Sequence, residues 1–137
     1  MEITWTELSG TPLVRLDYAN DDRWSRLLRA VEAASFDGVP VAVEIFEHRR
    51  YDGLSVEDVL RELPADHGWP ILLAADRQTL TSAELPIQVV DLNAPAQRFR
   101  VIPEHLFDVE ANLSLHNMDF EEFVSACDSD RIFRGFS

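Results

Sequence analysis

The chain has 137 residues, of which 46% are hydrophobic, and its 25 acidic and 12 basic side chains give a net charge of −13. A chain of this size can bury a core of its own, so we expect a single domain over residues 1–137. The negative charge disfavours nucleic acids and anionic membranes as partners, because an acidic surface repels both.

Location and redox chemistry follow from the same composition. No apolar run approaches the length of a membrane span, and the start "MEITWTELSG" lacks the basic and apolar segments of a signal peptide, so we expect a cytoplasmic protein. The only cysteine, Cys127, falls on an apolar helical stripe, which favours a buried and unreactive thiol. All twelve basic residues are arginine, a bias typical of a GC-rich genome.

The first part of the chain alternates strands and helices. Residues 12–17 predict a strand, and residues 21–35 predict an amphipathic helix capped by Asn20 or Asp21. After a turn at 37–38, the nearly unbroken apolar run 39–47 predicts a central strand that is covered on both faces.

A short helix and a third strand continue this alternation. Residues 54–63 predict a helix capped by Ser55, and residues 70–76 predict another buried strand. Strands that alternate with helices in this way are parallel and are joined by right-handed crossovers.

The pattern changes after residue 76. Strands predicted at 87–92 and 98–102 are separated by "NAPAQ", a hairpin-length connection, so these two should be antiparallel. Pro103 suits the first turn of a helix that runs to about residue 113. Asp119 and Glu122 predict a capping box at the start of a last helix over 119–127.

These elements predict an α/β fold of order β-α-β-α-β-β-β-α-α. We expect a mixed sheet of about five strands with the helices packed on it. Several stretches, "PLVRLDYANDDRW", "LLAADRQTL", "FRVIPEHLFDVEANLSLHNMDFEEF" and "RIFRGF" among them, also make the chain resemble a small actinobacterial family known only as a domain of unknown function. The resemblance spans nearly the full length and implies a free-standing bacterial domain, but no activity and no site residue.

Three acidic residues lie at the ends of the predicted parallel strands, namely Asp17, Glu47 and Asp76. Ligands of open α/β sheets bind outside the carboxyl ends of such strands, and three carboxylates there could hold Mg²⁺. The structural alternative, which we favour, is that Asp17 and Asp76 cap the turns that follow them. No phosphate-binding loop, CxxC, HExxH or GxSxG motif is present, so we expect no cofactor.

A carboxylate inside the strand predicted at 39–47 needs a partner. Glu44 interrupts an apolar run, and an ionised carboxylate is seldom buried without a counter-charge. Arg15 of the first strand is the predicted partner, in either a structural ion pair or the floor of a pocket.

The most uneven feature of the charge pattern is the segment from Val101 to Asp130, which has eight carboxylates and no arginine. It predicts a negative surface that includes Glu104, Asp108, Glu121, Glu122 and Asp128. Two functions compete. The first is a non-catalytic protein-binding or regulatory module, similar in kind to an immunity protein or antitoxin, that docks a basic partner. The second is a small Mg²⁺-dependent enzyme that acts on a phosphorylated substrate at the strand-end carboxylates.

Overall fold

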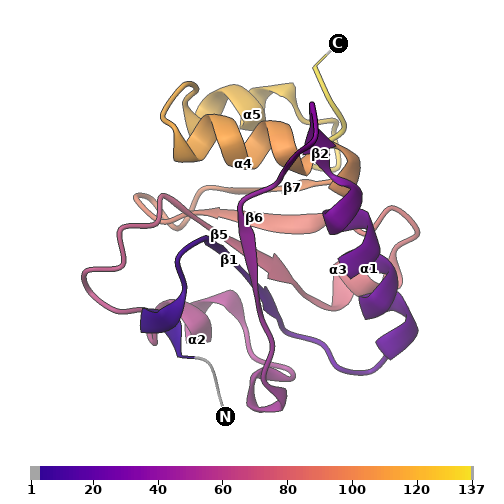
Figure 1. The fold of residues 1–137 in the computed structure, drawn as a ribbon, viewed down its shortest axis with the longest axis vertical. Helices are drawn as coiled ribbons and strands as arrows, with labels where there is room; N and C mark the ends of the chain where they lie inside the picture. Colours follow the sequence, from indigo (N-terminus) through magenta and orange to yellow (C-terminus); the bar gives the residue numbers. More distant parts are fainter. Residues whose placement is uncertain (1–3, 137) are drawn as a thin grey trace.

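The computed structural model describes residues 4–136 and builds them around a six-stranded sheet of order β4-β1-β5-β6-β7-β8 (Figure 1). The strands of this sheet are β1 (Thr11–Arg15), β4 (Val43–Phe46), β5 (Ile71–Ala75), β6 (Ile87–Asp91), β7 (Arg98–Val101) and β8 (Ile132–Phe133). β6 is antiparallel to both of its neighbours, whereas the other pairings are parallel. The predicted mixed α/β architecture is therefore confirmed.

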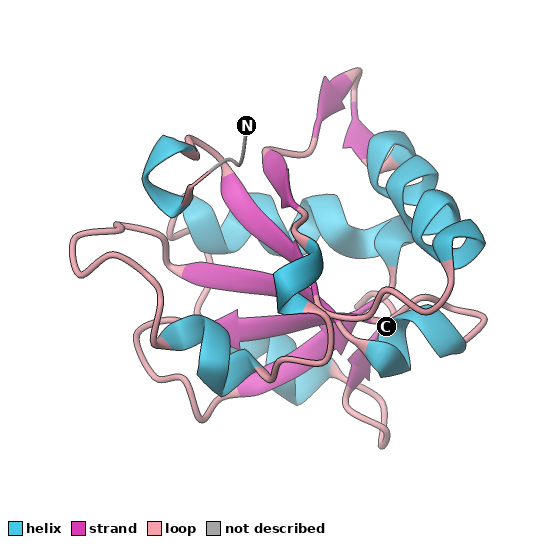
Figure 2. Cartoon of the chain, turned by 90° about the horizontal axis from the view of Figure 1, so that it is seen from below, coloured by secondary structure: helices cyan, strands magenta, loops and turns pink. Residues whose placement is uncertain are grey.

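Helices cover both faces of the sheet, and a two-stranded hairpin of β2 (Ser35–Phe36) and β3 (Val39–Pro40) projects beside α1 (Figure 2). The α-helices are α1 (Asp21–Ala33), α2 (Val56–Leu60), α3 (Arg77–Thr81), α4 (Leu106–Ser114) and α5 (Phe120–Ala126). Three 3-10 helices add single turns: η1 (Trp5–Glu7), η2 (Arg49–Tyr51) and η3 (Pro103–His105). No helix within residues 4–136 has the length and apolarity that a membrane crossing requires.

The core has two parts, one on each face of the sheet. On the larger one, α1, α3, α4 and α5 bury side chains such as Leu27, Leu80 and Phe123. On the other, η1, η2 and α2 enclose Tyr51 and Phe46, and the ring of Trp5 stacks on Phe46 at 3.8 Å. α1 and α2 follow the neighbouring strands β1 and β4 but lie on opposite faces of the sheet. The connections that leave these two strands therefore run in opposite directions.

The expectation of a central strand over 39–47 is wrong in two respects. Val39 and Pro40 pair with the hairpin strand β2, and only Val43–Phe46 joins the main sheet, at its edge. The crossover through α1 places β4 on the outer side of β1, and the crossover through α2 returns the chain to the inner side. The middle of the sheet is instead formed by β5 and β6, and β1 and β5 are the two strands whose residues are all buried.

Three short elements were not predicted: α3, β8 and the β2–β3 hairpin. Each has only two to five residues per helix or strand, too few for a hydrophobic period to show. The predicted helix caps, by contrast, are present at Asn20, Ser55 and Asp119. In the capping box at Asp119, the Asp119 backbone N–H donates a hydrogen bond to Glu122 Oε2 at 2.7 Å.

Candidate functional site

Arg15, the last residue of β1, is a buried charged side chain, with only 2% of its surface exposed. The sequence predicted Glu44 as its partner, and this prediction is wrong. Nη1 donates to Glu47 at 3.0 Å, Nη2 donates to Asp21 at 2.8 Å, and Nε donates to the carbonyl of Asp17 at 2.9 Å.

The pairing of β1 with β4 explains the error. Pro12 lies opposite Glu44, and Leu13 lies opposite Ile45. Side chains alternate between the faces of a sheet, so Arg15 shares its face with Leu13 and Ile45, whereas Glu44 points to the other face. Arg15 and Glu44 therefore point to opposite faces of the sheet and do not meet.

Glu44 instead organises the turn before β1. Its Oε1 accepts hydrogen bonds from the backbone N–H groups of Ser9 and Gly10, both at 2.8 Å, and from the Ser9 hydroxyl at 2.5 Å. These bonds, that of the Ser9 hydroxyl foremost, lower the pKa of Glu44 below its ordinary value. The carboxylate is thus satisfied without an arginine.

The three strand-end carboxylates do not assemble into the predicted Mg²⁺ site. Asp17 accepts from the backbone N–H of Ala19 at 2.9 Å, which is a turn cap, and Glu47 pairs with Arg15. Within residues 4–136, no three His, Cys, Asp or Glu side chains are grouped so that they could hold a metal ion. Asp17, Glu47 and Asp76 therefore have separate structural partners.

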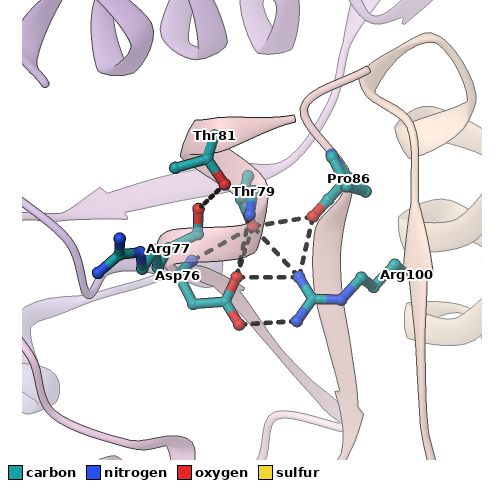
Figure 3. Close-up of polar contacts among 6 residues, drawn as sticks. All are labelled: Asp76, Arg77, Thr79, Thr81, Pro86 and Arg100. Atoms are coloured by element: carbon teal, nitrogen blue, oxygen red, sulfur yellow. Dashed lines mark hydrogen bonds and ion pairs between the residues drawn. The ribbon is translucent and has the colours of Figure 1, made fainter. Parts of the chain in front are cut away.

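Asp76 is at the centre of a polar network between β5, α3 and β7 (Figure 3). It caps α3 by accepting from the Thr79 backbone N–H at 3.1 Å, and it binds Arg100 through both oxygens, at 2.9 and 2.7 Å. Arg100 also donates to the carbonyl of Pro86 at 3.2 Å. Burial opposes ionisation of Asp76, but the hydrogen bonds and charge of Arg100 outweigh it and keep the pKa of the carboxyl below its usual value.

The sequence signal for Arg100 was the alternation in "RFRV", where Phe99 and Val101 face the core and the two arginines face away. Alternation predicts the face but not the partner. Arg98 contacts Glu57 of α2 at 2.7 Å, and Arg100 contacts Asp76, so both arginines of β7 neutralise acids from distant segments.

Not every acidic residue of the arginine-free segment contributes to an unpaired negative surface, because Asp128 binds an arginine and Glu110 is buried. Glu104, Asp108, Glu121 and Glu122, which we call the acidic face, are all exposed on η3, α4 and α5. Asp128 is also exposed, but it binds Arg134 together with Glu84 and Asp130.

Glu110 is the buried carboxylate of the segment. Although it belongs to the acidic run, it is buried beneath α4 and accepts a hydrogen bond from Thr11 Oγ1 at 2.9 Å, with Ser114 as a further donor. The negative surface is therefore smaller than the count of eight carboxylates suggested.

Cys127 is unsuited to catalysis. Its Sγ lies 3.3 Å from the carbonyl of Phe123, and burial raises the pKa of the thiol to about 11. A thiol with this pKa is almost fully protonated at neutral pH and is a poor nucleophile.

The model of one family, described as a domain of unknown function (DUF6924), matches residues 10–136. No curated protein matches the chain.

Proposed function

We propose that this chain, which belongs to the DUF6924 family of domains of unknown function, is a non-catalytic binding module that docks a basic protein through its acidic face. The observation that carries the proposal is the distribution of ion pairs. None of the four acidic-face side chains pairs with an arginine within residues 4–136, whereas Arg15, Arg50, Arg61, Arg98, Arg100 and Arg134 are paired with other carboxylates. A bacterial and cytoplasmic setting stays a prediction of the sequence.

Uncompensated charge on one face favours encounter with an opposite charge. Long-range attraction raises the association rate and discourages partners of like charge, and it weakens as salt screens it over about 10 Å at 0.1 M. The acids that are bound to arginines contribute little to the negative field of the protein, because the charge of each is offset by a cation within 4 Å.

Exposed apolar side chains beside the acidic face offer short-range contacts. Phe36 of the hairpin is 62% exposed, and its ring stacks on Phe107 at the start of α4, 5.9 Å away. Leu115, directly after α4, is 69% exposed. Large apolar side chains within a polar surround are typical of docking surfaces, so the expected partner is basic and also carries apolar side chains.

The test uses a synthetic amphipathic peptide of arginine and leucine as a defined probe, with association followed by surface plasmon resonance. Glu104→Arg together with Glu121→Arg should slow association about tenfold at low salt. Glu7→Arg with Asp66→Arg makes the same change in total charge at exposed positions in η1 and after α2, on the other face of the sheet, and is the matched control. Glu122 is left unchanged because it also caps α5.

Two further readouts complete the test. Backbone amide shifts on adding the peptide should map to η3, α4 and α5, and Leu115→Ser should speed dissociation without changing the association rate. If both double variants slow association equally, total charge alone explains binding, and the proposal fails.

A further inference from the structure

A pocket of about 540 Å³ opens where the chain diverges after β1 and β4, between the start of α1 and the segment that leads to η2. In open α/β sheets, ligands bind outside the carboxyl ends of two neighbouring strands whose connections leave to opposite faces. β1 and β4 are such a pair, because α1 packs on one face and α2 on the other. We call this cavity the switch-point pocket.

The inner wall of the pocket is built on Arg15. Its three hydrogen bonds fix the guanidinium, whose carbon lies 4.2 Å from the Tyr18 ring centroid and 5.0 Å from that of Trp24. A guanidinium has five N–H donors. One N–H on each terminal nitrogen therefore stays without a partner among the described residues.

Two more donors of the inner wall are unsatisfied. Trp24 Nε1 and the Tyr18 hydroxyl are buried, and neither donates a hydrogen bond within residues 4–136. The backbone amide of His48 approaches the Tyr18 oxygen and lowers its pKa, yet burial and the charge of Glu47 prevail and raise this pKa to about 12. Because the His48 amide can only donate, the phenol proton lacks an acceptor. An unsatisfied buried donor costs about 1–3 kcal/mol, and an oxygen acceptor placed beside these groups would recover that cost.

The outer wall has the opposite character. Asp21 and Glu47 are 76% and 42% exposed, and each uses one carboxylate oxygen to bind Arg15. The second oxygen of each has no partner among the described residues. The donor side chains Arg15, Tyr18 and Trp24 are therefore the more buried part of the pocket lining, whereas the carboxylates of Asp21 and Glu47 are exposed, as is Arg49, which adds one more cation.

Phosphate is a poor fit for this arrangement. The connection from β1 to α1, residues 16–20, contains no glycine that would let the backbone surround a phosphate, and Asp21 and Asp22 occupy the first turn of α1. A ligand with only a positive charge would leave the inner donors unsatisfied, and one with only a negative charge would face the exposed carboxylates.

We propose that the switch-point pocket binds a small zwitterion, an α-amino acid, with its carboxylate on the donors of Trp24, Tyr18 and Arg15 and its ammonium group between Asp21 and Glu47. The pocket is larger than the two charged groups need, and Leu28 in its wall provides an apolar contact for the side chain of the amino acid. This site is separate from the acidic face and does not depend on the docking function.

The indole N–H of Trp24 reports directly on binding. The chain has three tryptophans, so a ¹⁵N-labelled sample gives three indole signals, and Trp24→Phe identifies that of Trp24. On titration with L-leucine, and then with the other L-amino acids, this signal should shift downfield and saturate. The indole of Trp5, which already donates to Tyr51 at 3.2 Å, should not move and serves as the internal control.

Single-charge probes and variants separate the two halves of the site. Acetate and n-butylamine, tested alone, should bind at least tenfold more weakly than the amino acid. Tyr18→Phe removes a hydroxyl that donates no hydrogen bond among the described residues, so the fold should be retained, and affinity should fall about three- to tenfold. Glu47→Gln should lower affinity about tenfold, whereas Glu84→Gln, another exposed carboxylate paired with an arginine, should leave it unchanged.

Three results would overturn the proposal. The first is that no amino acid shifts the Trp24 indole signal at about 10 mM, a concentration that detects even very weak complexes. The second is that acetate binds as tightly as the amino acid, which would make the pocket an anion site. The third is an affinity that Tyr18→Phe and Glu47→Gln both leave unchanged.

Discussion

Asp76→Asn tests whether the Asp76–Arg100 pair holds β5, α3 and β7 together. Asparagine has nearly the same shape and is a good helix N-cap, so the bond from the Thr79 backbone should survive. The substitution removes the charge and one of the two bonds to Arg100, which keeps its bond to the Pro86 carbonyl.

The expected cost follows from these bonds. Hydrogen bonds to charged groups contribute about 1.5–3 kcal/mol, and complete loss of a buried partner costs about 3–5 kcal/mol. Since Arg100 keeps part of its network, we expect a loss of about 2 kcal/mol in the free energy of unfolding at pH 7, equivalent to about 6 °C in Tm for a chain of this size. Urea denaturation followed by circular dichroism measures the first quantity, and calorimetry the second.

The pH dependence gives an independent check. The pKa of Asp76 is lower in the folded than in the unfolded state, so its contribution is present above the unfolded pKa and is lost as pH falls through the folded pKa. The difference in stability between wild type and Asp76→Asn should therefore be largest near neutral pH and should shrink below about pH 4.

Asp91→Asn is the matched control, because Asp91 also ends a strand and caps a turn, by accepting from the Asn93 backbone N–H at 2.9 Å, but binds no arginine within residues 4–136. It should cost less than about 0.5 kcal/mol. Equal costs for the two variants, or a difference that stays constant between pH 7 and pH 3, would refute the assigned role of the ion pair.

Three other expectations can be measured on the same samples. Glu44→Ala removes the acceptor of the Ser9 turn and should cost about 1–2 kcal/mol in urea denaturation, more than an exposed glutamate would. Burial raises the pKa values of both tyrosines, Tyr18 and Tyr51, to about 12, so ultraviolet absorbance should show little phenolate at pH 11. Because burial favours the protonated form in the folded state, the free energy of unfolding should fall as pH rises above 10. Asp119→Ala should cost about 1 kcal/mol through loss of the α5 cap without affecting peptide binding, and an unchanged stability with lost binding would contradict the structural role.

Local features of this protein could be predicted from the sequence. The caps at Ser55 and Asp119, the antiparallel hairpin of β6 and β7, and the parallel arrangement of β1 and β5 were all expected and are present. These features depend on residues within one helical turn, one hairpin or one crossover, so the signal and the structure it produces are close in the chain.

The partners of charged side chains could not be predicted in the same way. Arg15 pairs with Glu47, 32 positions away, because the register of β1 against β4 brings both to one face of the sheet. Side chains alternate with a period of two, so assigning Arg15 to the opposite face of the sheet exchanges Glu47 for Glu44 as its partner. Strand order, which placed β4 at the edge, likewise depends on the direction in which each crossover turns.

The switch-point pocket shows this division most clearly. Tyr18, Trp24 and Glu47 carry no motif and belong to three different segments of the chain. Only the packing of α1 and α2 on opposite faces separates the connections after β1 and β4 and leaves room between them. The sequence by itself determined the longer helices and strands and their caps, because those signals are local. The tertiary structure alone determined which polar side chains meet, because that depends on strand order, register and the face to which each helix returns.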